Sequence, residues 1–131
     1  MWDIIKEEGA DYCCKEKMKK SLSIIVPAYN EEKNLANTIL VINKALNSLI
    51  EDYEILIFND CSKDRTGEIA DELAKKDKRI KVIHNPINMS LGYNYIKGIK
   101  LANKEFIMMI PGDDDIPEEG IRQILKEIGN A

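Results

Sequence analysis

The chain has 131 residues, of which 44% are hydrophobic and 32% charged, so it can form one globular domain with a buried core. Its 19 Lys and Arg residues against 23 Asp and Glu residues give a formal net charge of -4, which excludes the broad basic surface that binds a nucleic acid backbone. The cysteines are odd in number, and Cys13 and Cys14 are adjacent, which favours a reducing compartment.

No stretch of the sequence is typical of a targeting signal or a membrane span. The longest aliphatic runs, such as Ile24–Val26, are far shorter than the roughly 20 apolar residues of a spanning helix, and residues 1–20 are charged throughout. We predict a cytoplasmic protein with a charged N-terminal extension over 1–20 and one domain over 21–131. Trp2 and the lysines of Lys15–Lys20 leave open a peripheral contact of the extension with the inner membrane surface.

Short apolar runs alternate with longer segments of helical period, and this pattern predicts βαβ units around a parallel sheet. The first strand is predicted at 22–26, before Pro27, which cannot donate to a sheet ladder. Asn30 is then expected to cap a helix that has Glu31 and Glu32 in its first turn. The apolar positions of this helix step by four and three: Leu35, Ile39, Ile42, Leu46 and Leu49.

Two further strand and helix pairs follow. A strand at 53–58 leads through a polar turn to a helix with one apolar face, formed by Ile69, Ala70, Leu73 and Ala74. A third strand near 80–83 ends before Asn85-Pro86, and Ser90 begins the next helix. The buried stripe of that helix is predicted to be Leu91, Tyr95, Ile99 and Ala102.

The fourth strand, 106–110, is apolar at every position, which is typical of a central strand covered on both faces. Asp115 is the expected N-cap of a last helix that has Pro117 in its first position and an apolar face of Ile121, Ile124, Leu125 and Ile128. The sequence thus predicts a three-layer α/β/α domain with a Rossmann-like, mostly parallel sheet. Because ligands bind outside the carboxyl ends of such strands, the polar residues there form the candidate site.

Four segments resemble the family-2 inverting glycosyltransferases of the GT-A fold, such as dolichyl-phosphate mannose synthases. These segments are Ser23–Glu32, Glu54–Thr66, Asn88–Gly98 and Phe106–Pro117, and their order and spacing make the resemblance specific. It implies the nucleotide-binding half of an enzyme that transfers a sugar from a UDP- or GDP-linked donor to an acceptor such as a lipid phosphate or a glycan. It also implies Mg²⁺ or Mn²⁺ as a cofactor.

The resemblance assigns nucleotide-binding positions. In the family, the segment corresponding to Pro27, Ala28 and Tyr29 forms the wall of the nucleotide pocket, and Glu31 lies beside it. A tyrosine at a strand end also offers a flat face to a base, the alternative being that it packs on the top of the sheet. Asp60 matches an acid that recognises the pyrimidine edge, because a carboxylate accepts the ring N–H. An Asx turn that caps the next helix is the alternative for Asp60.

The expected metal site departs from the family pattern. Family members carry Asp-x-Asp, whose carboxylates hold a divalent metal that bridges the donor phosphates. Here Asp113 matches the second acid and Pro111 stands in place of the first. Asp113 is therefore the expected ligand, with Asp114 and Asp115 as further candidates, because hard divalent cations prefer carboxylate oxygens. An acidic cluster stabilised by the following helix N-terminus is the alternative.

The remaining expectations concern two single residues and the extent of the chain. His84 is expected to be a satisfied edge residue, and Cys61, at the place of a family glycine, a small turn residue. The family's general base lies downstream of the matched region, so the chain is expected to be a piece of a longer enzyme or a naturally short relative. A nucleotidyltransferase is disfavoured because Pro27–Glu31 is not a Gly-rich phosphate loop, whereas a non-catalytic binding or interaction module stays open. Exposed sheet surface would also favour a homo-oligomer.

Overall fold

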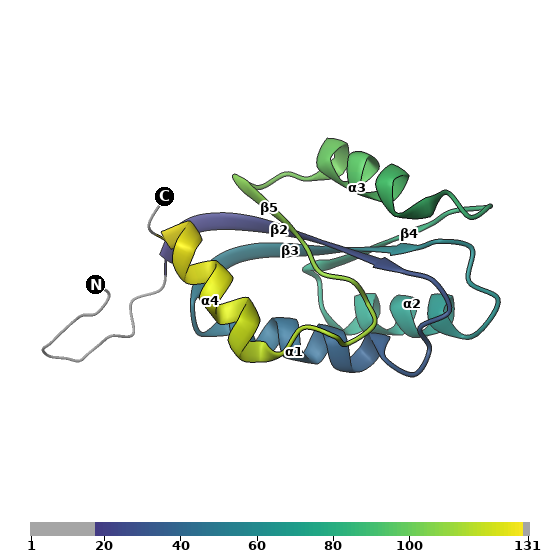
Figure 1. The fold of residues 1–131 in the computed structure, drawn as a ribbon, viewed down its shortest axis with the longest axis horizontal. Coiled ribbons are helices and arrows are strands. Elements are labelled where there is room, and N and C mark those ends of the chain that lie inside the picture. The colour runs from purple at the N-terminus through teal and green to yellow at the C-terminus, as the bar shows by residue number, and fades with distance from the viewer. Residues whose placement is uncertain (1–17, 130–131) are drawn as a thin grey trace, which may run out of the picture.

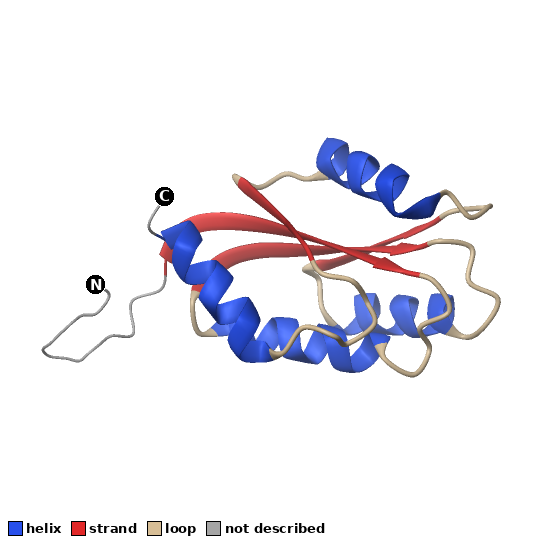
Figure 2. Cartoon of the chain, in the orientation of Figure 1, coloured by secondary structure: helices blue, strands red, loops and turns tan. Residues whose placement is uncertain are grey.

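The computed structural model describes residues 18–129, which form a four-stranded parallel sheet with helices on both faces (Figures 1 and 2). Cys13, Cys14, Trp2 and most of the predicted extension lie outside the described residues. The elements, in chain order, are β2 (Met18–Ala28), α1 (Leu35–Asn47), β3 (Ile50–Asn59), α2 (Thr66–Lys76), β4 (Ile80–His84), α3 (Ser90–Leu101), β5 (Phe106–Met109) and α4 (Glu118–Gly129).

The strand order is β4-β3-β2-β5, so β2, the first described strand, lies inside the sheet and the later strands are added on both sides of it. From Ser21 onward β2 pairs with β3 without a register shift, and its Leu22 pairs with Tyr53 of β3 and with Phe106 of β5. Helices α1, α2 and α4 cover one face, and α3 alone lies on the other (Figure 1). The three-layer α/β/α architecture and the parallel sheet predicted from the sequence are confirmed.

Alternation along the two central strands divides the core between the two faces of the sheet. The larger cluster lies under α1 and α4 and includes Ile24, Val26, Ile42, Ile121 and Leu125, all fully buried. The smaller cluster lies on the face of α3 and consists of Ile25, Leu56 and Phe58. Because β2 and β3 are buried on both faces, their sequences are almost continuously apolar.

β5 corrects one prediction, because within residues 18–129 it is an edge strand that pairs with β2 alone. Phe106, Ile107 and Met109 are only partly buried. An apolar run indicates that the faces of a strand are covered by other elements. It does not indicate whether the strand pairs with one strand or with two.

The start of α1 corrects a second prediction. Asn30 does not cap this helix, which begins at Leu35 and has no acidic residue in its first turn. Asn30 instead has a positive φ of 54°, and Glu31 accepts hydrogen bonds at its carbonyl from the backbone amides of Asn34 and Leu35. The acidic pair therefore forms a separate turn that leads into the helix.

The buried stripe of α3 is also different from the prediction. Leu91, Tyr95 and Ile99 are exposed, and the buried positions are Asn94 and Gly98. Gly98 lies so close to the sheet that an added Cβ atom would be 2.5 Å from Cδ1 of Ile25. A helix at this distance packs through its small residue, so its larger apolar side chains point elsewhere.

The last helix follows most of its predicted apolar face, with Ile121 and Leu125 buried and Ile128 partly buried. Ile124 corrects the prediction, because it is exposed at the border of this face. Its start differs, because α4 begins at Glu118 and Asp115 lies two residues before the N-cap position. Pro117 directly precedes the helix, and the three aspartates lie in the loop before it. None of the helices within residues 18–129 has the length and apolar character needed to cross a membrane.

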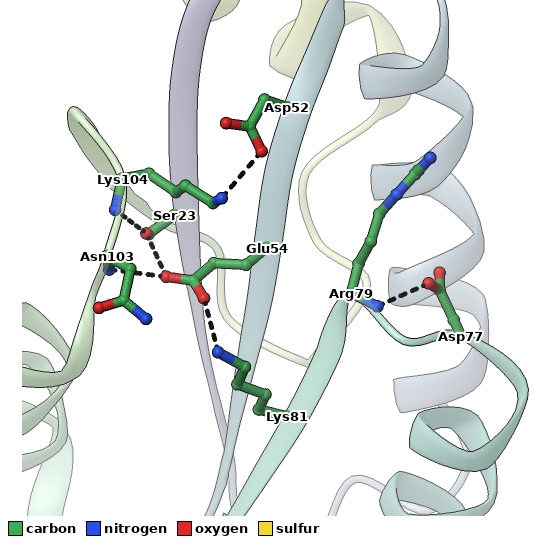
Figure 3. A network of polar contacts seen from close by, with 8 residues as sticks. All are labelled: Ser23, Asp52, Glu54, Asp77, Arg79, Lys81, Asn103 and Lys104. Carbon is green, nitrogen blue, oxygen red and sulfur yellow. Dashed lines mark hydrogen bonds and ion pairs between the residues drawn. The ribbon is translucent and has the colours of Figure 1, made fainter.

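A polar network fixes the amino end of the sheet (Figure 3). The buried Glu54 accepts hydrogen bonds from Oγ of Ser23 at 2.7 Å, the backbone amide of Asn103 at 2.8 Å and Nζ of Lys81 at 3.3 Å. Burial acts to raise the pKa of Glu54, but these hydrogen bonds outweigh it and hold the pKa below the ordinary value. The network thereby ties the loop before β5 to the two central strands.

A shallow hollow of about 290 Å³ adjoins this network, and Glu54, Arg79 and Lys104 are among its lining residues. It lies at the amino ends of β3 and β4, the opposite edge of the sheet from the candidate site. Several of its charged groups are paired with one another, as the ion pairs of Lys104 with Asp52 at 2.8 Å and of Lys81 with Glu54 at 3.3 Å illustrate. We assign it to the framework of the fold.

Candidate functional site

The strands end together at the carboxyl edge of the sheet, and backbone hydrogen bonds continue the ladder beyond them. The amide of Asp60 donates to the carbonyl of Ala28 at 3.0 Å, and the amide of Gly112 donates to the carbonyl of Pro27 at 3.0 Å. The residue that follows Ala28 is Tyr29, so it leaves the sheet between the end of β3 and the end of β5. The edge predicted from the sequence therefore brings the first, second and fourth motifs together.

Tyr29 is the aromatic side chain at this edge, and its exposed fraction is 45%. This exposure argues against the alternative that the ring packs within the top of the sheet. Pro27 and Ala28, which directly precede the tyrosine, are both buried and fix its backbone at the end of the strand. An exposed ring on a fixed strand end can stack on a planar ligand.

Side-chain hydrogen bonds cross-link the turns after β2 and β3. The amide of Asn30 donates to Oγ of Ser62 at 3.0 Å, and its side-chain oxygen accepts from the amide of Lys63 at 2.8 Å. The amide of Glu31 donates to Oγ1 of Thr66 at 2.8 Å. The carboxylate of Glu31 accepts a hydrogen bond from the side chain of Asn34. The two turns therefore form one rigid unit.

Asp60 lies at the centre of a buried network that the sequence did not predict. Its Oδ1 accepts from Nδ2 of Asn85 at 3.0 Å and from the amide of Met89 at 2.7 Å, and its Oδ2 accepts from the amide of Ser90 at 3.0 Å. Asn85 also donates to Oδ1 of Asn94 at 2.6 Å. Asp60 thus binds the N-terminus of α3. The alternative Asx turn would instead have placed it at the N-terminus of α2, the helix that directly follows it.

The environment of Asp60 favours its charged form. Burial of the side chain, which is 4% exposed, acts to raise its pKa. The hydrogen bonds from Met89, Asn85 and Ser90 outweigh this effect and hold the pKa below its ordinary value of 3.8. The helix N-terminus is a favourable place for a negative charge as well.

The lowered pKa predicts a pH dependence of stability. Because the unfolded chain binds the proton more tightly, the Asp60 carboxylate stabilises the fold above the ordinary pKa, and this stabilisation is lost as the pH falls through the folded pKa. We expect the free energy of unfolding in urea to fall between about pH 5 and pH 3, and to fall less steeply in Asp60→Asn. Part of the slope should remain, because Glu54 has a lowered pKa too. Equal slopes in both proteins would contradict this assignment.

His84 and Cys61 occupy the places that the sequence predicted. The side-chain amide of Asn59 lies 3.0 Å from Nδ1 of His84, and Nε2 lies 2.9 Å from Oδ1 of Asp71. Since the amide donates, Nδ1 accepts and Nε2 carries the hydrogen, so the histidine is satisfied at the edge. Cys61 has a φ of 62° in the turn and donates its thiol to the carbonyl of Pro86. A left-handed conformation explains the resemblance of this position to a glycine.

The three aspartates after β5 are all exposed but have different surroundings. Asp113 accepts a hydrogen bond from the backbone amide of Asp115 at 3.1 Å, which forms an Asx turn. Asp114 has a φ of 59° and accepts from Nδ2 of Asn37 on α1 at 2.7 Å. Asp114 is therefore directed toward α1, whereas Asp113 lies next to Gly112, which is bound to the end of β2.

The described residues contain no group of three or more His, Cys, Asp and Glu side chains that could hold a metal ion by itself. The fit to a divalent cation thus depends on the exposed carboxylate of Asp113. Mg²⁺ and Mn²⁺ sites often use one or two carboxylates and complete the shell with substrate phosphates and water. The donor set present fits a metal that arrives with a phosphate ligand.

Comparison with known proteins identifies first the fold and then the family. Residues 1–349 of TarS from S. aureus, solved in complex with UDP, match 86% of this chain and 32% of that chain, at 27% identity and a TM-score of 0.69. The chain is therefore a Rossmann-like α/β domain of the GT-A type. Residues 23–131 match glycosyl transferase family 2, and the chain belongs to this family.

Two further relatives support this membership. The glycosyltransferase EpsJ of Bacillus subtilis, itself uncharacterized, is 38% identical over 106 residues, which are 81% of this chain and 30% of EpsJ. The dolichol-phosphate mannosyltransferase of Pyrococcus furiosus is 36% identical over 110 residues, which are 84% of this chain and 30% of that protein. The chain thus spans about a third of the length of the relatives it matches.

Proposed function

We propose that this chain supplies the donor-binding part of a glycosyltransferase and binds a nucleoside-diphosphate sugar at the carboxyl edge of its sheet. The observation that carries the proposal is the meeting of Tyr29, Asp60 and Asp113 at the ends of three adjacent strands in a member of family 2. The UDP and UDP-GlcNAc complexes of TarS support this class of ligand.

Each residue has a proposed task. The exposed ring of Tyr29 stacks on the base, and Pro27 and Ala28 hold it in place from the strand end. Oδ2 of Asp60 accepts one hydrogen bond, against two at Oδ1, and is the acceptor for the ring N–H of uracil or guanine. Glu31 fixes the turn that carries Tyr29 through its bonds to Thr66 and Asn34.

Asp113 is the proposed ligand of Mg²⁺ or Mn²⁺, with Asp115 beside it, while Asp114 keeps its bond to Asn37. A divalent cation held there would offset negative charge on the diphosphate of the donor. Sugar transfer to a lipid phosphate or glycan acceptor is proposed for the whole site, of which these residues form the donor side.

Calorimetric titration with UDP and with GDP, each with and without Mn²⁺, tests the proposal. We expect binding of at least one nucleotide to require Mn²⁺, and Asp113→Ala to weaken it by about tenfold or more through the loss of a metal ligand. Glu119→Ala, which removes an exposed negative charge at the start of α4, is the matched control and should bind as the wild type does.

The outcome against the proposal is equally definite. Circular dichroism first establishes that each protein is folded. A folded wild-type chain that binds neither nucleotide with Mn²⁺ would favour an interaction module derived from this fold. Equal losses in Asp113→Ala and Glu119→Ala would show that overall charge, and not a ligand at Asp113, governs the affinity.

A further inference from the structure

The outer face of α3 is the largest concentration of exposed apolar side chains in residues 18–129. Ten large hydrophobic residues are exposed in this part of the chain, and six of them lie on this one helix of 12 residues: Leu91, Tyr93, Tyr95, Ile96, Ile99 and Leu101. Single exposed apolar residues are ordinary, but a contiguous set marks an interaction surface, and all of these residues except Leu101 lie within about 200° of one another around the helix. We call the other five residues the α3 face.

The helix presents this face outward because of how it is held. Asn94 and Gly98 are its buried positions, and Ile96 lies about 200° around the helix from each of them, on the opposite side. The exposed fraction of Ile96 is 56%, the highest among the large hydrophobic residues of the helix. Asp60 holds the N-terminus and Ile25 contacts the Gly98 position, so the face is fixed on the sheet without any rearrangement.

The charge on α3 has one sign. The helix has two lysines and no acidic residue, whereas Lys81 and Lys104, which lie beyond its ends in the sequence, are already paired with Glu54 and Asp52. The whole chain is acidic, with a net charge of -4. Lys97 and Lys100 lie on α3 itself, and Nζ of Lys97 is 5.9 Å from the ring centroid of Tyr93. A partner surface that is apolar and negatively charged is therefore complementary to this face.

We propose that the α3 face binds an anionic lipid surface, with the helix lying in the plane of the interface. Isoleucine and leucine side chains enter the acyl boundary, tyrosines lie at the level of the headgroups, and lysines extend their charged ends to the phosphates. A second copy of the chain fits less well, because pairing two α3 faces brings lysines together without carboxylates between them. The N-terminus of α3 lies at Asp60, so the bound surface adjoins the candidate donor site.

Sedimentation of the full chain with phosphatidylcholine vesicles, with and without phosphatidylglycerol, tests this proposal. We expect binding to the anionic vesicles, and a loss of about fivefold or more in partitioning for Ile96→Ser/Ile99→Ser. The matched control is Leu40→Ser/Ile124→Ser, because the exposed fractions are 50% and 44% at these positions against 56% and 42% at the α3 pair. Lys97→Gln/Lys100→Gln should weaken binding mainly to the anionic vesicles.

Several results would overturn the proposal. The wild type staying in the supernatant, or equal losses in the two serine pairs, would exclude a specific role for α3. Full binding by Ile96→Ser/Ile99→Ser would assign the contact to another part of the chain. A dimer in light scattering that the same variant dissociates, without vesicle binding, would assign the face to a second copy. Because nucleotide titration does not use this surface, its result is independent of the sedimentation result.

Discussion

Replacing Asp60 with alanine is expected to lower the free energy of unfolding by about 3 kcal/mol. The substitution removes the acceptor of Nδ2 of Asn85 and of the backbone amides of Met89 and Ser90. Each buried donor that is left unpaired costs about 1–3 kcal/mol. Water that enters the space can pair with some of the three donors and so lowers the total cost. Urea unfolding followed by circular dichroism measures the change.

Two variants show whether the hydrogen bonds cause the loss. Asp71→Ala removes a half-exposed carboxylate that pairs with His84, and it should cost less than about 1 kcal/mol. Asp60→Asn keeps one acceptor oxygen and turns an amide toward the N-terminus of α3, so its stability should lie between those of the wild type and the alanine variant. A wild-type stability for Asp60→Ala would mean that α3 does not depend on this carboxylate.

Asp60 has two roles, so a change in nucleotide affinity in its variants has two possible causes. A residue proposed to accept the base N–H also holds α3, so a loss of nucleotide affinity in Asp60→Ala would reflect the disordering of Met89 and Ser90 as much as a missing contact. Asp113 is free of this ambiguity, because it is exposed and its partner is the amide of Asp115 in its own loop. Asp113→Ala therefore tests nucleotide binding more directly than Asp60→Ala does.

The sequence predicted the architecture because the signals that define it are local. The apolar runs around Ile24 and Ile55, and the turn residues after them, fix the strands and the parallel order. Even the edge position of the candidate residues followed, since all strands of a parallel sheet end on the same side. The motif positions Tyr29, Asp60 and Asp113 were therefore brought to one edge as expected.

The hydrogen-bond network and the packing of α3 were missed because they depend on long-range contacts. Nothing local links Asp60 to Asn85 and Asn94, which are 25 and 34 positions away, although two asparagines at a strand end and on a helix face were a usable signal. The predicted α3 stripe rests on the spacing of apolar residues alone. Periodicity identifies an apolar face but does not indicate whether that face packs on the sheet. In α3 the small residue Gly98 packs on the sheet instead of the apolar face.

Replacing Gly98 with alanine is expected to lower the free energy of unfolding by about 2 kcal/mol, against the usual preference of helices for alanine. The new Cβ atom would lie 2.5 Å from Cδ1 and 2.8 Å from Cγ1 of Ile25. Ile25 is fully buried, so its side chain has little space into which it could move. Overpacking of this kind costs about 1–3 kcal/mol and exceeds the gain of about 1 kcal/mol in helix propensity.

The same helix provides the control for this prediction. An added Cβ atom at Gly92 meets nothing within 4 Å, so Gly92→Ala should raise stability by about 0.5–1 kcal/mol through propensity alone. Ile25→Val removes the terminal methyl that clashes, so combining it with Gly98→Ala should cost less than the sum of the two single changes. Additive losses, or a gain in Gly98→Ala like that in Gly92→Ala, would mean that α3 lies further from β2 than the contact with Ile25 implies.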